Sequence, residues 1–253
     1  ETLRRAVLQK FNERYGWECQ NVETDLHNDL RLHKIPVDAA NTLINSLRIC
    51  DPAVGSGHFL VSALNELIAV KSDLGILCHP DGKLLPLNAV VGNDELILTD
   101  PDTDQPIEYR PGVLASQRIQ ETLFHEKQTL IENCLFGVDI NPKSVMICRL
   151  RLWIELLKHA YFRADSKYQR LETLPNIDIN IKTGNSLVSR FALDEDLKDV
   201  FAKGKIKAAD YRLAVAAYKN ASDKTAKAGL LEQIGRVKSA IYEAFYLNNP
   251  LNK

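Results

Sequence analysis

The stretch Asp51-Pro52-Ala53-Val54-Gly55-Ser56-Gly57-His58-Phe59-Leu60 decides how the rest of the chain is interpreted. A short apolar lead precedes it, and an apolar run at helical spacing follows it, namely Leu60, Leu64, Leu67 and Ile68. This order predicts a strand, a tight glycine turn and a helix. The two glycines let the backbone turn sharply and approach a ligand closely, and the N–H groups that open the helix can bind an anion. The stretch therefore predicts a nucleotide-type ligand.

Two nucleotide-binding motifs with similar glycines do not fit these positions. The dinucleotide fingerprint needs a third small residue three positions after its second glycine, where this chain has Leu60. The phosphate-binding loop needs Gly-Lys-Ser/Thr, which does not occur in the sequence. Asp51 at the end of the strand can accept an ammonium group or hydroxyls. A ligand with a cationic amino-acid end therefore fits better than a pyrophosphate. The alternative is a simple strand-to-helix bend without a ligand, but such a bend would need neither the glycine pair nor the acid.

Length and composition limit the class of protein. The 253 residues can form one large or two small domains. A formal net charge of −1 gives no whole-chain attraction to nucleic acid, so DNA affinity would need a local patch or another domain. The five cysteines include no Cys-x-x-Cys pair, which favours reduced thiols in a cytoplasmic protein and predicts no metal site. No apolar run approaches the ~20 residues of a membrane span, and there is no signal peptide, so no membrane partner is expected.

Hydrophobic spacing predicts an alternation of helices and strands. Strands are expected at 47–51, 135–140 and 177–181, and short β-type runs at 89–91, 96–98 and 107–109 indicate a hairpin between residues 76 and 111. Helices are expected at 2–15, 22–32, 37–47, 59–70, 116–134, 142–160, 206–218 and 226–246. Such alternation predicts a parallel sheet with right-handed crossovers. We expect a helical segment at 1–47, a ligand-binding core at 48–190 with 76–134 inserted, and a helical extension at 191–253.

Ligands of parallel α/β sheets bind outside the carboxyl ends of the strands. This rule brings together the glycine turn, Asp139 and Asn185, which lie far apart in the sequence. Asp139 has an apolar strand before it and an Asn-Pro helix start after it. Of the nearer acids, Asp73 follows polar residues, and Asp94 follows an apolar run but lies in a Gly-Asn turn with no helix start after it. Its carboxylate can accept both hydroxyls of a ribose. The alternative is that Asp139 only complements the dipole of the following helix.

Two neighbouring residues have less specific interpretations. Ile140 can pack on the face of a bound adenine or serve in the hydrophobic core. Asn185 can pair with the amino edge of adenine, because an amide offers both a donor and an acceptor, or it can form a turn after Gly184.

Three separated stretches, Asp51–Leu60, Gly137–Pro142 and Thr183–Leu187, resemble consecutive cofactor motifs of adenine-specific (N6) DNA methyltransferases. The resemblance is nearest to the methylase region of type IIG restriction-modification enzymes, and it covers roughly residues 47–190. It implies an α/β, Rossmann-like, S-adenosylmethionine-dependent methyltransferase fold, with a central mostly parallel sheet, flanking helices, a β-hairpin insertion and a helical C-terminal extension. It assigns cofactor binding to Asp51, Pro52, Ala53, Gly55, Ser56, Gly57, Phe59, Asp139, Ile140 and Asn185.

The same resemblance implies methyl transfer to N6 of adenine in double-stranded DNA, with the target base flipped out of the duplex. It also allows a restriction nuclease domain in the same polypeptide. Because methyl transfer from a sulfonium to an amine needs positioning more than a base, we interpret His58 as a residue that lines the loop.

Two departures from the family pattern matter. The catalytic Asn/Asp-Pro-Pro-Tyr/Phe motif is not found, and Asn248-Asn249-Pro250-Leu251 lacks the second proline and the aromatic residue, so we interpret it as a helix terminator. The upstream aromatic-Thr-Pro motif is expected just before Glu1. We therefore assign no catalytic residue, expect a piece of a longer enzyme, and expect this chain alone not to methylate DNA.

Two other functions stay open. The chain could serve a methyltransferase that acts on RNA or protein, or it could be a non-catalytic DNA-binding or assembly module that keeps a relict methyltransferase fold. The intact glycine turn and Asp139 count against the relict module. An NAD-dependent oxidoreductase is the least supported class, because Leu60 breaks its fingerprint.

Overall fold

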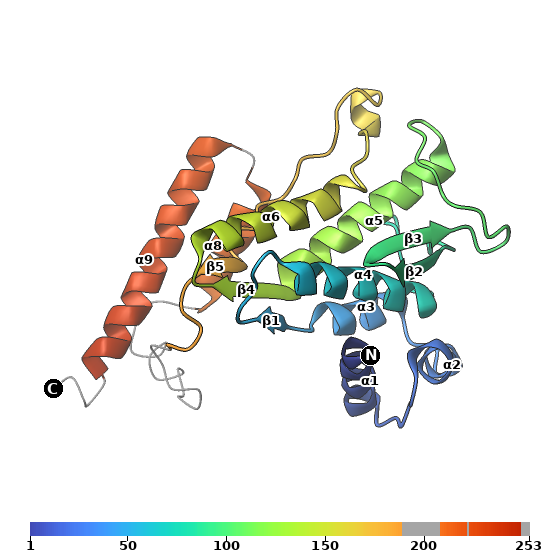
Figure 1. Ribbon diagram of the computed structural model, residues 1–253, viewed down its shortest axis with the longest axis horizontal. Helices are drawn as coiled ribbons and strands as arrows, with labels where there is room; N and C mark the ends of the chain where they lie inside the picture. The colour runs from blue at the N-terminus through green and yellow to red at the C-terminus, as the bar shows by residue number, and fades with distance from the viewer. Residues whose placement is uncertain (189–207, 222, 249–253) are drawn as a thin grey trace. The chain divides into compact units, whose positions relative to one another are not determined.

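The computed structural model describes residues 1–188, 208–221 and 223–248. Contacts divide the chain into two compact units (Figure 1). The first unit consists of Glu1–Leu174 and Asn180–Asn185, and the second of Pro175–Ile179 and Ser186–Lys253. The first unit contains the sheet and the glycine turn, and the described helices of the second unit form a small core of their own.

The central sheet of the first unit is parallel, as predicted. Strands β1 (Ile49–Asp51), β4 (Leu135–Asp139) and β5 (Ile181–Thr183) lie in the order β1-β4-β5. Asp51 is opposite Gly137 in β4, and Asp139 is opposite Thr183 in β5. The carboxyl ends of all three strands therefore meet at one edge of the sheet.

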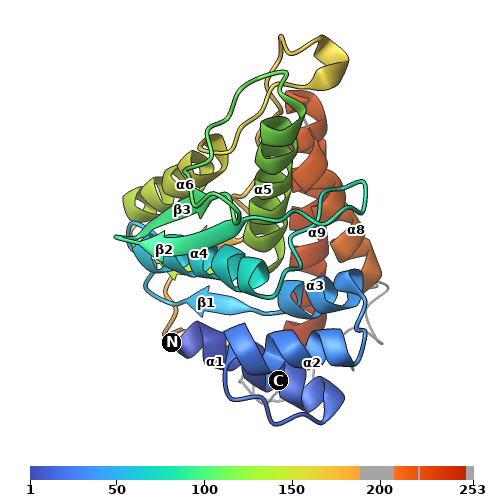
Figure 2. The same ribbon diagram turned by 90° about the vertical axis from the view of Figure 1, so that its right-hand side faces the viewer.

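The helices of the first unit form where apolar residues recur at helical spacing. They are α1 (Thr2–Tyr15), the π-helical turn η1 (Val22–Leu26) that continues into α2 (His27–Leu32), α3 (Val37–Asn45), α4 (His58–Asp73), α5 (Leu114–Asn133), α6 (Pro142–Leu157) and the short 3-10 turn η2 (Ala164–Ser166). Helices α4, α5 and α6 lie on one side of β1, and α1 and α2 lie on the other (Figures 1 and 2). The predicted helices of this unit are confirmed, with ends that differ by a few residues.

Apolar side chains of α4, α5 and α6 make most of the core that supports the sheet. The fully buried ones include Leu60, Leu64 and Ile68 of α4, Leu123, Phe124 and Leu130 of α5, and Leu152 and Leu156 of α6. Helix α5 thus belongs to the main helical layer, although the sequence placed it within an insertion. Burial of side chains of this size contributes about 1.5–3 kcal/mol each.

The predicted hairpin is formed by β2 (Asn88–Gly92) and β3 (Glu95–Thr99). Its two turn residues, Asn93 and Asp94, have φ angles of 50° and 64°, the left-handed pair that a type I′ turn requires. The hairpin is fastened to α4, because Ser72 Oγ donates to the carbonyl of Leu87 at 2.6 Å and accepts from the N–H of Ala89 at 3.0 Å.

The third β-type run, 107–109, was predicted wrongly as a strand. Only an isolated bridge joins Thr99 to Pro106 there. The bridge consists of two bonds, from the N–H of Ile107 to the carbonyl of Leu98 at 3.1 Å and from the N–H of Asp100 to the carbonyl of Gln105 at 3.0 Å, and the pairing does not continue along 107–109.

The position of the last strand also corrects the sequence prediction. The alternating residues 177–181 were expected to form it, but β5 begins only at Ile181. Asn180 closes a turn, since its Nδ2 donates to the carbonyls of Ile131, Glu132 and Leu135 at 2.9, 2.9 and 3.1 Å. Ile179 instead is partly buried and packs against the core of the second unit. The alternation therefore reflects burial in two different cores and not one pleated strand.

The second unit is built around helices α8 (Ala208–Asn220) and α9 (Lys224–Asn248). Their core contains Ala214, Tyr218 and Ile234, and the Tyr218 hydroxyl donates to Asp178 Oδ2 at 2.9 Å. Both predicted helices are confirmed over the described residues, while residues 206–207 and 249–251 lie outside them. No helix among the described residues is both long and apolar enough to cross a membrane.

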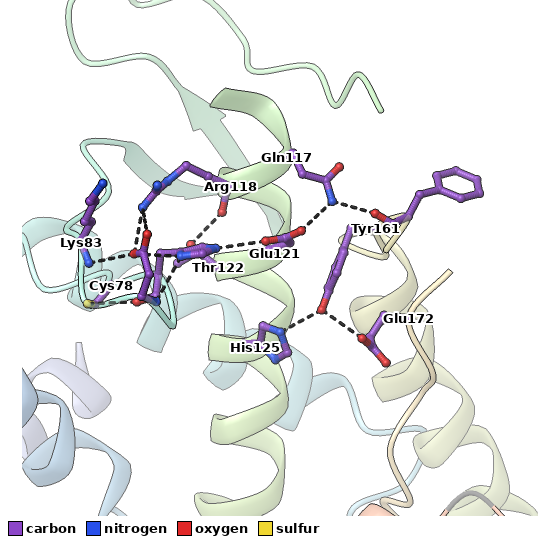
Figure 3. Close-up of polar contacts among 12 residues, drawn as sticks. Cys78, Lys83, Gln117, Arg118, Glu121, Thr122, His125, Tyr161 and Glu172 are labelled. Carbon is purple, nitrogen blue, oxygen red and sulfur yellow. Dashed lines mark hydrogen bonds and ion pairs between the residues drawn. The ribbon is translucent and has the colours of Figure 1, made fainter. Parts of the chain in front are cut away.

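A polar network joins the N-terminal half of α5 to the loops that contain residues 78–83 and 161–172 (Figure 3). Glu121 lies 3.0 Å from His79 and accepts from Gln117 at 2.7 Å. The Tyr161 hydroxyl bonds to His125 and Glu172 at 2.9 and 3.1 Å. Burial raises the pKa of Tyr161, and Glu172 raises it further, so the phenol stays protonated as a donor.

A buried ion pair joins α5 to α6. Lys127 Nζ lies 2.9 Å from Glu155 Oε2, and the two side chains are 0% and 7% exposed. Lys158 contacts the other oxygen of Glu155 at 2.9 Å. Burial by itself raises the pKa of Glu155, but the two ammonium groups outweigh it and the pKa is lowered. Burial also lowers the pKa of His159, to about 3, so this imidazole is neutral.

We predict that Glu155→Gln destabilises the protein by about 3–5 kcal/mol at neutral pH, because it leaves the Lys127 ammonium buried without its countercharge. The ionised Glu155 stabilises the wild-type protein above its unfolded-state pKa, and this stabilisation is lost as the pH falls through the lowered folded-state pKa. The difference in the free energy of unfolding between wild type and variant therefore becomes smaller in acid. Urea unfolding measures both effects.

The matched control for this variant is Glu108→Gln, which removes the same charge from an exposed pair with Arg110. We expect that change to lower the free energy of unfolding by about 0–1 kcal/mol. Equal decreases in the two variants would show that the buried pair stabilises the fold no more than an exposed one.

Candidate functional site

The glycine turn after β1 is held over the end of β4 by backbone hydrogen bonds. The N–H of Val54 donates to the carbonyl of Val138 at 2.9 Å, and the N–H of Gly57 donates to the carbonyl of Val54 at 2.8 Å. Asp51 Oδ1 accepts from the N–H of Ala53 at 3.0 Å. The loop therefore has a fixed path from the end of β1 to the start of α4.

Asp139 connects the loops that follow all three strands. Its Oδ2 accepts from the N–H of Gly55 at 2.9 Å, and its Oδ1 accepts from the N–H of Asn141 at 2.8 Å. Its backbone carbonyl accepts from Gly184, after β5, at 2.9 Å. Each carboxylate oxygen has about two lone-pair sites, so both oxygens can still accept a hydroxyl from a ligand.

Both glycines of the turn adopt left-handed backbone conformations, with φ of 50° at Gly55 and 82° at Gly57. Gly57 is also pressed against α6, because a Cβ at this position would lie 2.6 Å from Cys148 Sγ. The sequence predicted a need for small residues here, but not the neighbour that causes it.

Gly137 is a site residue that sequence reasoning missed. It lies in the middle of β4, where a Cβ would come within 2.8 Å of Val54 Cγ2. Its small size lets the glycine turn lie directly on the central strand. A glycine inside a strand pattern signals such a close approach of another backbone, and this signal was available in the sequence.

The first turn of α4 offers backbone donors at the same edge. Gly57 is the N-cap and provides no side-chain acceptor for the N–H groups of the first turn. By contrast, α6 is capped as predicted, with Asn141 Oδ1 accepting from Lys143 at 3.0 Å and Pro142 in the first turn. The start of α4 thus keeps the capacity to bind an anionic group.

The remaining predicted residues lie around this edge and are largely exposed. Ile140 is 73% exposed among the described residues, which does not fit its alternative role in the core. Phe59 is 55% exposed on α4, and Asn185 follows Gly184 at the end of β5. Pro52, Ala53 and Ser56 are exposed in the loop itself, where Ser56 Oγ accepts from Arg151 Nη1 at 3.3 Å.

The geometry fits a nucleoside with a charged end better than a metal ion. A fixed carboxylate, two glycines, free helix donors and an exposed apolar side chain surround one edge of a parallel sheet. Among the described residues there is no group of three or more His, Cys, Asp and Glu that could hold a metal. The fold is that of a Rossmann-like α/β protein, a class in which ligands bind outside the carboxyl ends of the strands.

Comparison with known proteins identifies the family. Residues 133–226 match the Eco57I restriction-modification methylase family; the chain belongs to this family and has the methyltransferase type of α/β fold. A protein of Methanocaldococcus jannaschii, named a type II restriction enzyme and methyltransferase, is 33% identical over 207 residues. The aligned part is 79% of this chain but only 14% of that relative. No solved structure matches.

We predict that Gly57→Ala destabilises the protein more than Gly55→Ala. Both substitutions force an L-residue into a left-handed conformation, at about 1–2 kcal/mol each. Only Gly57→Ala also collides with Cys148, whereas the nearest atom to a Cβ at Gly55 is 3.9 Å away. The collision should add about 1–3 kcal/mol in urea unfolding without ligand. Equal losses would contradict the close packing of the turn on α6.

Proposed function

We propose that this chain is the cofactor-binding part of a DNA methyltransferase that transfers a methyl group from S-adenosylmethionine to N6 of adenine in a restriction-modification system. One observation carries the proposal. The carboxylate of Asp139 is fixed by the N–H groups of Gly55 and Asn141 beside a two-glycine turn, in a chain that matches restriction-modification methylases.

The proposed assignment runs across the edge of the sheet. Asn185 after β5 pairs with the amino edge of the adenine, and Ile140 covers a face of this ring. Asp139 accepts the ribose hydroxyls, because both of its oxygens lie at the carboxyl end of the central strand. The amino-acid end then falls at the glycine turn, with Asp51 accepting the ammonium group. Bound S-adenosylmethionine would supply the methyl group as a sulfonium donor.

The other predicted loop residues line the same proposed pocket. Gly55 and Gly57 allow the close approach of the ligand, and Pro52, Ala53, Ser56 and Phe59 border it. We assign no acid–base pair for the transfer, because the proposed role of the chain is to bind and orient the donor.

The acceptor part of the reaction requires residues outside the assigned set, because no Asn/Asp-Pro-Pro-Tyr/Phe motif occurs in the sequence. The chain spans about one seventh of the length of the curated relative that it matches. We propose that methylation, binding of double-stranded DNA and any nuclease activity belong to a longer polypeptide. The name of the relative, which joins a restriction enzyme and a methyltransferase, supports this arrangement.

We predict that Asp139→Ala weakens the binding of S-adenosylhomocysteine, the demethylated cofactor, by about 10–100-fold. The estimate corresponds to the loss of hydrogen bonds to a charged acceptor. Isothermal titration calorimetry measures the change. Asp102→Ala removes a carboxylate from an exposed loop and should leave the affinity unchanged. Wild-type protein that does not bind the ligand would favour the relict, non-catalytic module.

The choice of methyl acceptor has its own test. The longer natural protein is incubated with double-stranded DNA and S-adenosylmethionine, and the nucleosides are identified by mass spectrometry. We expect N6-methyladenine. Methylated cytosine would refute the proposed specificity, and methylation of RNA or protein but not DNA would support the other methyltransferase class.

A further inference from the structure

The turn of the β2–β3 hairpin places a carboxylate beside the first residue of α4. Asp94 Oδ2 lies 3.6 Å from His58 Nε2. Two further side chains of α4 contact the same residue: Ser62 Oγ lies 3.4 Å from Asp94 Oδ1, and Asn65 Nδ2 donates to the Asp94 carbonyl at 3.2 Å. Residues 58, 62 and 65 share one face of the helix, so the hairpin turn is seated along this face.

The position of Asp94 is set by rigid structure. Asn93 and Asp94 form the type I′ turn between paired strands, with Gly92 opposite Glu95. The side chain of Asn65, which holds the Asp94 carbonyl, belongs to a fully buried residue. The hairpin therefore presents the Asp94 carboxylate to His58 from a fixed backbone.

Stability does not explain this contact. The side chains of His58 and Asp94 are 61% and 62% exposed. Exposed ion pairs contribute about 0–1 kcal/mol, so the pair adds little to the folded state. Both side chains are open to a ligand, and His58 directly follows Gly57 at the end of the glycine turn.

The amino-acid end of the proposed cofactor has to lie near this pair. With adenine at Asn185 after β5 and ribose at Asp139 after β4, the next position along the edge is the turn after β1. Asp51 at the start of this turn is suited to the ammonium group of the amino acid. The carboxylate of the same amino acid needs a cationic or N–H partner, and His58 stands at the other end of the turn.

We infer that Asp94 orients His58 so that the imidazole binds the carboxylate of the amino-acid end of the cofactor. The two ring nitrogens point in different directions, so Nε2 can stay beside the Asp94 carboxylate, 3.6 Å away, while the N–H at Nδ1 donates to the ligand. His58 is a binding residue in this scheme, and Asp94 is a positioning residue that acts through it. The hairpin becomes a part of the cofactor site, and the inference rests on the proposed function.

Arg151 is another possible partner for the ligand carboxylate beside the turn. Its Nη1 donates to Ser56 Oγ at 3.3 Å from helix α6. It could take the ligand carboxylate in place of His58, so the test has to separate the two residues.

The test compares two ligands by calorimetry. S-adenosylhomocysteine carries the amino-acid end, and 5′-methylthioadenosine lacks it. We expect His58→Ala to weaken the binding of S-adenosylhomocysteine by about tenfold, as for one charge-assisted hydrogen bond, and to leave methylthioadenosine unchanged. Asp94→Asn should have the same selective effect, because asparagine tolerates the left-handed turn and leaves its backbone in place. The effect should be smaller, because Asp94 acts only through His58.

Glu95→Gln is the matched control, because it removes the neighbouring carboxylate of the same turn, which contacts Lys158 at 3.4 Å. It should leave both affinities unchanged. In the double variant His58→Ala/Asp94→Asn, the affinity for S-adenosylhomocysteine should equal that of His58→Ala alone.

Three outcomes would overturn the inference. Equal weakening of both ligands by His58→Ala would indicate a general disturbance of the turn. Additive losses in the double variant would show that Asp94 does not act through His58. If Arg151→Gln, and not His58→Ala, abolished the tighter binding of S-adenosylhomocysteine relative to methylthioadenosine, the partner of the ligand carboxylate would be Arg151. If wild-type protein binds neither ligand, the proposed function itself fails.

Discussion

The candidate site depends on the carboxylate of Asp139 at the end of the central strand. It accepts one N–H from the turn after β1 and one from the start of α6, while its own carbonyl receives the N–H of Gly184. Hydrogen bonds to an ionised acceptor are about twice as strong as neutral ones. A single residue thus fixes three loops, and its bond to Gly55 alone joins residues that are 84 positions apart in the sequence. The geometry available to a ligand follows from these bonds.

Close packing adds a second constraint on the same turn. Gly137 lets Val54 rest on β4, and Gly57 lets the start of α4 rest on Cys148 of α6. At both places a side chain would occupy the space of a neighbouring group. The turn is therefore held between the sheet and α6, so that its backbone donors and its exposed side chains keep fixed positions. This arrangement suits a site that works by positioning a ligand.

The segment between the glycine turn and β4 is more closely integrated than an insertion needs to be. Its helix α5 contributes Phe124 and Leu130 to the core and the buried Lys127 to an ion pair with α6. Its hairpin lies along α4 and reaches the end of the glycine turn through Asp94. The long spacing between Gly57 and Asp139 therefore reflects added structure that supports the site from the side of α4.

The sequence by itself determined the features that depend on neighbouring residues. Apolar spacing located the helices, the strand-glycine-helix order located the turn, and the Asn-Pro start after an apolar strand distinguished Asp139 from Asp73 and Asp94, because caps and periodicity act within a few positions. Only the tertiary structure decided the start of β5, since Ile181 is buried in the first unit whereas Ile179 is partly buried against the core of the second unit. It alone showed that Gly57 meets Cys148, that Gly137 meets Val54 and that Asp94 meets His58. Such contacts join residues that only folding brings within reach, and no local pattern encodes their distances.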